Sequence, residues 1–211
     1  MHRCRLHVLG ASGSGTTTLG RAVADSWSVP HADADDYFWV PTDPPFTTKR
    51  TPAERLALMD QMFAPRDAWV LSGAMTGWGE QIVETCSAIV FLTLDPDVRM
   101  SRLRERESRR REGGAMDDDA WRDFRDWARS YDDPSFTGRS RHQHEAWLAA
   151  RSQPILRLDA ARTVTELRDE VLAWEPADRR TRPSREPAQP LPQSQSQSPS
   201  PGPRPGNPVT R

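Results

Sequence analysis

Gly10-Ala11-Ser12-Gly13-Ser14-Gly15-Thr16-Thr17, near the start of the chain, is the stretch that decides the fold. It fits the pattern G-x-x-x-x-G-K-[ST] at every fixed position except one, because Thr16 stands where the pattern has lysine. Residues 5–9 before it are mostly apolar, and residues 17–27 after it carry apolar side chains at helical spacing. Strand, glycine loop and helix in this order are the context of a phosphate-binding P-loop.

The predicted phosphate contacts come from the loop backbone and from hydroxyl groups. Glycines allow backbone N–H groups to turn inward, and the positive end of the following helix adds to the attraction for anions. Thr17 takes the position whose hydroxyl binds Mg²⁺ in this pattern. The alternative is a glycine-rich turn that only joins a strand to a helix. The predicted nucleotide-binding residues are Gly10, Ser12, Gly13, Ser14, Gly15, Thr16, Thr17 and Thr18.

Thr16 removes the mobile positive charge that normally reaches the outer phosphates. One charge-assisted hydrogen bond contributes roughly 1.5–3 kcal/mol. Loss of this hydrogen bond would slow a reaction at these phosphates by about ten- to a hundredfold. This is a handicap for chemistry at the loop and no proof of inactivity, provided that arginines supply the charge from elsewhere.

Strands alternate with helices along residues 1–175, which predicts an α/β domain with a five-stranded parallel sheet and right-handed crossovers. Apolar runs predict strands at residues 5–9, 31–32, 69–71, 88–94 and 155–158. Helical spacing predicts helices at residues 17–27, 52–63, 96–110, 118–130, 139–150 and 164–174.

The composition changes near Pro176, after which proline, serine, glutamine and arginine dominate up to Arg211. Such a segment buries too little apolar surface to offset its ordering entropy. We therefore predict two parts, a domain over residues 1–175 and a disordered tail over residues 176–211. Docking of a partner by the prolines of the tail is a weaker alternative.

The formal net charge of −1 gives no overall field toward nucleic acid or an anionic membrane, so neither is expected as a partner. Cys4 and Cys86 lack metal-ligand spacing and are expected to be reduced thiols near the core. Neither a signal-peptide core nor an apolar run that could span a bilayer is evident, which indicates a cytoplasmic protein.

Gly-Ser-Gly-Thr-Thr-Thr at residues 13–18 resembles the loop of one branch of cytidylate kinases, which carries threonine at this position. Residues 5 to about 173 resemble, more broadly, the small P-loop kinases (adenylate, shikimate and gluconate kinase). The resemblance implies a three-layer α/β/α P-loop NTPase fold with a helical lid insert. It also implies transfer of the γ-phosphoryl group of ATP, or of another nucleoside triphosphate, to a small-molecule or nucleotide acceptor with Mg²⁺. The alternative is a regulatory protein that binds nucleotide without turnover.

An acidic cluster follows the second predicted strand. In shikimate-kinase-like proteins an Asp-x-Asp at this place faces the P-loop, and the match implies that Asp33 helps to hold the metal. Asp35 would contact the acceptor and is the best general-base candidate, with Asp36 able to share that role. A helix cap or a turn is the alternative for the cluster. Tyr37, Phe38 and Trp39 would cover the acceptor or belong to the core.

The resemblance also places acceptor contacts further along the chain. Lys49 and Arg50 are candidates for an acidic acceptor, with a solvated charge pair as the alternative. Gly73 follows the third predicted strand and would let the backbone approach the acceptor. Asp95 is read as a helix cap. His142 and His144 do not share a helix face, which argues against a metal site there.

Arginine is abundant in the helix predicted at 96–110, which leads to the lid in the resembled kinases. Arg106 and Arg110 are the candidates for phosphate contact and catalysis, and Gly113 and Gly114 for a hinge. Most of the other arginines of the helix are expected to form a solvated face, paired with Glu105, Glu107 and Glu112. Arg139 and Arg141 are candidates for substrate contact from across the lid. The stretch 117–131 is longer than in a minimal lid, which leaves the class of acceptor open.

Overall fold

A computed structural model describes residues 1–43, 45–111 and 118–176, with only the backbone for Arg110 and Arg111. The predicted tail beyond Pro176, the predicted hinge at Gly113 and Gly114, and the side chain of Arg110 therefore lie outside the described residues. No helix within these ranges is long and apolar enough to cross a membrane.

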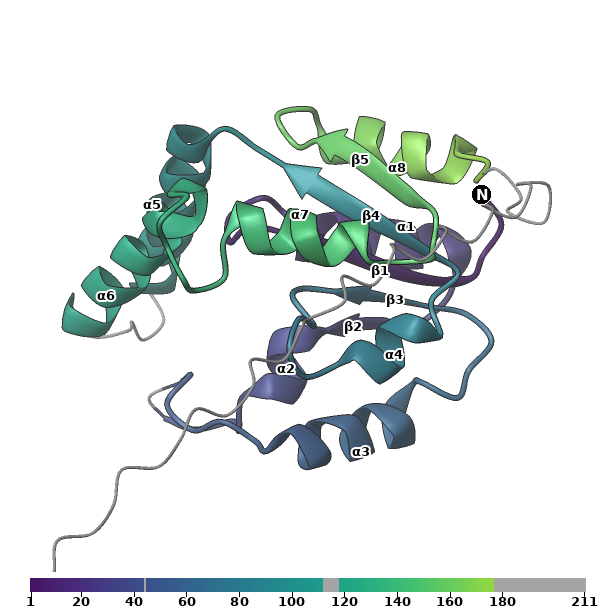
Figure 1. The fold of residues 1–211 in the computed structure, drawn as a ribbon, viewed down its shortest axis with the longest axis horizontal. Helices are drawn as coiled ribbons and strands as arrows, with labels where there is room; N and C mark the ends of the chain where they lie inside the picture. Colours follow the sequence, from purple (N-terminus) through teal and green to yellow (C-terminus); the bar gives the residue numbers. More distant parts are fainter. Residues whose placement is uncertain (44, 112–117, 177–211) are drawn as a thin grey trace, which may run out of the picture. The chain divides into compact units, whose positions relative to one another are not determined.

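The sheet has five parallel strands, as predicted, in the order β2-β3-β1-β4-β5 (Figure 1). The strands are β1 (Arg5–Gly10), β2 (His31–Asp33), β3 (Trp69–Ser72), β4 (Ala88–Thr93) and β5 (Ile155–Asp159). Because the strands are parallel, their carboxyl ends share one edge of the sheet. Gly10 and Asp33 end β1 and β2, so both candidate motifs reach this edge.

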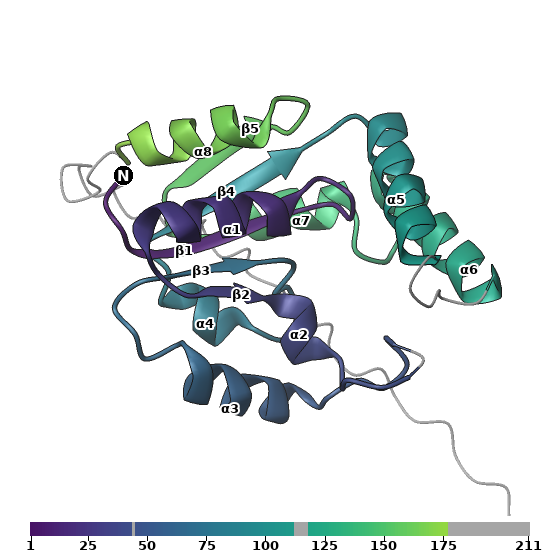
Figure 2. The same cartoon turned by 180° about the vertical axis from the view of Figure 1, so that it is seen from behind.

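Two apolar layers cover the sheet, which confirms the three-layer α/β/α arrangement. One layer packs Leu6 and Val8 of β1 against α1 (Thr16–Trp27) and α8 (Val164–Ala173), the two helices on the same face in Figure 2. The other packs Leu9 of β1 and Phe91 of β4 against α3 (Pro52–Met62), α4 (Glu80–Glu84) and α7 (Arg141–Ala149). The apolar runs of β1 and β4 reflect this burial on both faces.

Two short helices were not predicted. Both α2 (Ala34–Phe38) and α4 span five residues, too few to show a helical period. The Asp33 side chain caps α2 by accepting a hydrogen bond from the N–H of Asp35. In the segment that follows α2, one antiparallel bridge pairs Trp39 with Lys49.

The helical insert consists of α5 (Pro96–Arg111), α6 (Asp118–Arg129) and the 3₁₀ turn η1 (Ser130–Asp132). Met100 and Leu103 of α5 pack against the aromatic face of α6 that contains Trp121, Phe124 and Trp127. Helix α7 begins at Arg141, two residues later than predicted, because the hydroxyl of Ser140 caps it. Arg139 is therefore in the connection before α7 and not in the helix.

Candidate active site

Backbone geometry defines the phosphate loop. Gly13 and Gly15 have φ of 85° and 92°, values that L-residues with side chains rarely adopt. A Cβ on Gly13 would lie 2.8 Å from the carbonyl oxygen of Arg99, so α5 packs directly against the loop. Helix α1 starts at Thr16 without a side-chain cap. Its first-turn N–H groups thus remain available to phosphate oxygens, as predicted.

Two loop hydroxyls differ in their surroundings. The hydroxyl of Ser14 is buried and has no hydrogen-bond partner among the described residues. The side chain of Thr18 is exposed on α1, so it lies away from the enclosed part of the loop. A buried hydroxyl without a partner is costly unless something pairs with it. Ser14 therefore fits a loop that closes around the oxygen atoms of a ligand.

The predicted metal ligands meet. The hydroxyl of Thr17 donates a 2.7 Å hydrogen bond to Oδ2 of Asp33, which joins the first turn of α1 to the end of β2. The other carboxylate oxygen, Oδ1, accepts from the N–H of Asp35 at 3.1 Å. Asp33 thus caps a helix, as the alternative interpretation had it, and its carboxylate also faces the P-loop. A hydroxyl and a carboxylate are the hard oxygen donors that Mg²⁺ prefers.

Asp35 and Asp36 lie next to different charges. Desolvation and the neighbouring Asp33 raise the pKa of Asp35, while Arg139 and Arg106 act to lower it. The side chain reaches solvent at the surface of the site, although protein atoms crowd the carboxylate. The pKa of Asp36 is raised by desolvation and by Asp33, while Arg21 and His31 act to lower it. Asp35 is therefore the carboxylate on which the charges of Arg106 and Arg139 act.

Among the arginines predicted to enter the site, Arg139 contacts the phosphate loop. Its Nη2 donates a 3.2 Å hydrogen bond to the hydroxyl of Ser12, and its guanidinium lies 4.6 Å from the ring centre of Trp127. Arg106 is close enough to act electrostatically on Asp35. Arg141 instead forms an ion pair with Asp132 at 2.6 Å, so its contacts do not support the predicted substrate contact.

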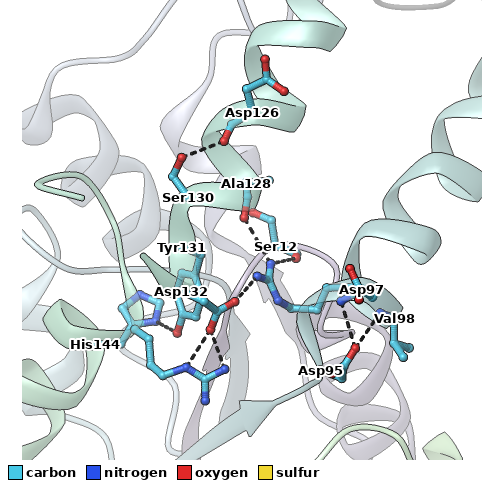
Figure 3. A network of polar contacts seen from close by, with 12 residues as sticks. Ser12, Asp95, Asp97, Val98, Asp126, Ala128, Ser130, Tyr131, Asp132 and His144 are labelled. Atoms are coloured by element: carbon cyan, nitrogen blue, oxygen red, sulfur yellow. Dashed lines mark hydrogen bonds and ion pairs between the residues drawn. The ribbon is translucent and has the colours of Figure 1, made fainter. Parts of the chain in front are cut away.

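Arg99 is a residue that sequence reasoning placed on a solvated face, and this was wrong. Its side chain is 1% exposed. Nη1 donates to the carbonyl oxygens of Ser12 at 3.2 Å and Ala128 at 3.4 Å, and Nη2 pairs with Asp132 at 2.6 Å. Figure 3 shows Asp132 at the centre of this network, with Ser12 and Ala128 beside it. Arg99 thus fastens the phosphate loop to the insert.

Arg102 was assigned to the same solvated face and also lies against the loop. Its Nη1 would be 3.9 Å from a Cβ on Gly15, and its Nη2 donates to the carbonyl oxygen of Ala160 at 3.0 Å. Arg99, Arg102, Leu103 and Arg106 follow the helical spacing i, i+3, i+4 and i+7. That spacing around the buried Leu103 was the signal that could have identified the inward face of α5.

Gly73 lies beside the acidic cluster, at φ 103° after β3. A Cβ there would be 2.9 Å from that of Ala34 and 3.7 Å from Oδ1 of Asp33. The Gly73 carbonyl contacts Nε2 of His7 at 2.8 Å, and burial lowers the pKa of His7 to about 4. Because the imidazole stays neutral near pH 7, it fixes the turn without adding charge to the site.

The two basic residues predicted to meet the acceptor differ in their contacts. Nη1 of Arg50 donates to the backbone carbonyls of Asp36, Tyr37 and Trp39. This holds the end of α2, a structural role that the sequence analysis did not foresee, and it gives no support to the predicted acceptor contact. The amine of Lys49 is exposed and lies 5.6 Å from the ring centre of Trp39.

Arg55 on α3 is a further residue that sequence reasoning missed. The residue is 6% exposed, and its guanidinium carbon lies 3.6 Å from the ring centre of Phe38 and 5.1 Å from that of Trp78. Nε is buried without a hydrogen-bond partner among the described residues. Burial lowers the pKa of this guanidinium. No local pattern marks Arg55, because its aromatic neighbours come from α2 and from the turn before α4.

Asp95 and His144 lie outside the site. Asp95 caps a helix as predicted, and His144 has a structural role in the core. The carboxylate of Asp95 accepts from the N–H groups of Asp97 and Val98, so it caps α5 as predicted. Nδ1 of His144 pairs with the hydroxyl of Tyr131 at 3.0 Å inside the core. Burial, followed by the charge of Arg139, lowers the pKa of His144 to about 4.

Comparisons with known proteins agree with this geometry. No family model matches the chain. An uncharacterized protein of Bacillus subtilis strain 168, YqaC, is 38% identical over 174 residues, which cover 80% of this chain and 96% of that protein. A cytidylate kinase of Methanocorpusculum labreanum is 28% identical over 119 residues, or 49% of this chain and 63% of that protein. The chain thus spans less than two thirds of this kinase.

A solved structure supports the fold. Shikimate kinase from Acinetobacter baumannii, in complex with shikimate, aligns with a TM-score of 0.50 and 13% identity over 81% of this chain and 91% of that chain. At this identity the likeness concerns the fold and not the substrate. The chain therefore belongs to the same family as YqaC of Bacillus subtilis and has the fold of the small P-loop kinases.

Proposed function

We propose that this protein transfers the γ-phosphoryl group of ATP, or of another nucleoside triphosphate, to a small-molecule or nucleotide acceptor in the presence of Mg²⁺. The observation that carries the proposal is the 2.7 Å contact between Thr17 and Asp33. It brings together the phosphate loop, a pair of oxygen ligands and, two residues on, the carboxylate of Asp35.

Each group has a place in the transfer. The backbone N–H groups from Gly13 to Thr17 hold the phosphates, and Thr17 and Asp33 are the residues that would hold Mg²⁺. The ion, when bound, neutralises charge on the phosphate oxygens. Asp35 accepts the proton of an attacking hydroxyl as that oxygen bonds to the γ-phosphorus and the bond to the nucleoside diphosphate breaks.

The acceptor side favours an acceptor with a negatively charged group. Arg55 holds a buried positive charge between Phe38 and Trp78, and none of the described residues forms an ion pair with it. A buried charge without a partner is destabilising, so an anionic ligand group that pairs with it would bind favourably. The exposed amine of Lys49 lies over the neighbouring aromatic side chains, Phe38 and Trp39, and can add to this attraction.

The alternative is a regulatory protein that binds nucleotide without turnover, and Thr16 is the feature that favours it. The two are separated by measuring nucleoside diphosphate release across a panel of nucleoside monophosphates, sugar acids and hydroxy acids, alongside binding of a fluorescent ATP analogue. Turnover on one acceptor supports the proposal. Binding with no turnover on any acceptor supports the alternative.

Two variants and the pH dependence of the activity test whether turnover takes place at this site. Thr17→Ala should lower the affinity for Mg²⁺-nucleotide, and Asp35→Asn should abolish turnover while binding persists. As a base, Asp35 acts only when deprotonated, so activity should fall as the pH drops through its raised pKa. A rate that is unchanged in Asp35→Asn would exclude Asp35 as the base.

A further inference from the structure

The phosphate loop lacks its own cation, and the structure brings arginines to it from other elements. With threonine at position 16, none of residues 10–18 carries a positive charge. Three arginines lie against the loop: Arg99, Arg102 and Arg139. They differ in how much of their charge is already engaged within the protein.

Arg99 and Arg102 are held by the chain itself. Arg99 is buried in an ion pair with Asp132, which neutralises its charge, and its Nη1 donates to two carbonyl oxygens. Its Nε is buried without a hydrogen-bond partner among the described residues. Arg102 is fixed to the carbonyl oxygen of Ala160 and lies beside Gly15, at the start of α1.

Arg139 differs from both. Its hydrogen bond goes to the side-chain hydroxyl of Ser12, and its guanidinium lies over Trp127, which keeps water away from one side. Within the described residues it forms no ion pair, and the carboxylate that acts on its charge is that of Asp35. An unpaired positive charge thus lies between the phosphate loop and the candidate base, where the transferred group would pass.

We propose that Arg139 supplies to the γ-phosphate of the nucleotide the positive charge that a lysine at position 16 would otherwise supply. The inference rests on the proposed function and assigns the missing charge of that same site to one residue. Such a cation stabilises charge on the transferring phosphoryl oxygens wherever in the chain it originates. Trp127 holds the planar guanidinium by stacking, a contact suited to arginine.

A double-mutant cycle tests this. The probes are the Mg²⁺ complexes of the non-hydrolysable ATP analogue AMPPNP and of ADP, with dissociation constants measured by calorimetry. Arg139→Gln should weaken AMPPNP binding by about 10- to 100-fold, the range for one charge-assisted hydrogen bond. ADP lacks the γ-phosphate, so its affinity should change by less than about threefold. In the Thr16→Lys background, Arg139→Gln should weaken AMPPNP binding by less than about threefold, because the lysine fills the role.

Two control variants isolate the charge. Arg139→Lys keeps the charge and should lose less than about fivefold in AMPPNP affinity, since the lysine lacks only the stacked plane. Arg122→Gln removes an exposed arginine of α6 that pairs with Asp119, and it should leave affinity unchanged. Thermal unfolding confirms that each variant is folded. Should Arg139→Gln fail to fold, Thr16→Lys alone still tests the inference. A gain in AMPPNP affinity above about 30-fold in this variant would mean that no residue of the wild-type protein supplies the positive charge.

The outcomes separate this inference from the function on which it rests. An equal loss from Arg139→Gln in both backgrounds, or equal losses for AMPPNP and ADP, would overturn the role of Arg139 while nucleotide binding stands. A wild-type protein that binds neither nucleotide would overturn the inference and the proposed function together.

Discussion

The phosphate loop and the helical insert both shape the candidate site, but they are specified in opposite ways. Residues 10–18 form their cradle from backbone conformation, with two glycines at positive φ and an uncapped helix start. The insert and the connection that follows it contribute through side chains from three separate stretches, represented by Arg99, Asp132 and Arg139. Backbone-built sites leave a fixed spacing in the sequence, whereas sites built from distant side chains do not.

The two regions nevertheless touch at Ser12. The carbonyl of this residue accepts from Arg99, and its hydroxyl accepts from Arg139. The insert thus supports the loop through Arg99, and Arg139, from the connection before α7, brings a second guanidinium to the same residue. Variants that damage one region and spare the other can separate these contributions.

The largest effect is expected at Gly13. Gly13 and Gly77 have nearly the same φ, 85° and 81°, but a Cβ on Gly13 would lie 2.8 Å from the Arg99 carbonyl, whereas one on Gly77 meets nothing within 4 Å. Both alanine variants incur about 1 kcal/mol of left-handed strain. Gly13→Ala adds roughly 1–3 kcal/mol of overpacking. It should also abolish AMPPNP binding, because the loop must move away from α5.

Chemical denaturation and calorimetry of the two variants measure this difference. Equal loss of unfolding free energy in Gly13→Ala and Gly77→Ala would show that the contact between the loop and α5 is unimportant. The contrast between a backbone-built loop and its side-chain support would then need revision.

The second-largest effect is a loss of stability expected when the ion pair of Asp132 in the insert is removed. Asp132→Asn leaves the buried guanidinium of Arg99 without its counter-charge, which should lower the free energy of unfolding by about 3 kcal/mol. Asp126→Asn is the matched control, since Asp126 forms an exposed pair with Arg125 and should lose at most about 0.5 kcal/mol. Urea denaturation measures both. A small loss in Asp132→Asn would mean that Arg99 does not depend on this partner.

The smallest effect on the free energy of unfolding is expected at Arg55, on the acceptor side, and here the substitution should stabilise the protein. Arg55→Met removes a buried charge that forms no ion pair with the other described residues and should stabilise the free protein by about 1 kcal/mol. Phosphoryl transfer to an anionic acceptor should fall at the same time, mainly through KM. Thermal unfolding and kinetics measure the two quantities. Destabilisation with unchanged KM would identify Arg55 as a structural residue of α3.

The sequence predicted most of the architecture for a physical reason. Buried strands such as β4 are continuous apolar runs, and long helices show their period, so both could be located. The five-residue helices α2 and α4 show no period and were missed. The closeness of Thr17 and Asp33 was expected from the resemblance to shikimate-kinase-like proteins, in which an Asp-x-Asp faces the P-loop, and the two side chains do form a hydrogen bond.

The side-chain part of the site could be predicted only in part. Arg139 was a candidate and does reach the loop. Arg50 was a candidate too, but it binds carbonyl groups at the end of α2. Arg99 and Arg55 were missed because their partners, Asp132 and Phe38, are set by tertiary packing. In a chain rich in arginine, residue type alone does not tell which guanidinium groups are buried.

Lys49 has a practical consequence, since it is the sole lysine of the chain. An amine-reactive fluorophore can attach only here and at the amino terminus. In general, α-amines lose their proton at lower pH than lysine amines and react first near neutral pH, so labelling at alkaline pH is what places a dye on Lys49. The dye would lie beside Trp39, a natural quencher of fluorescence. The emission of the labelled protein would then follow the loop around Lys49 in real time while acceptor compounds are added.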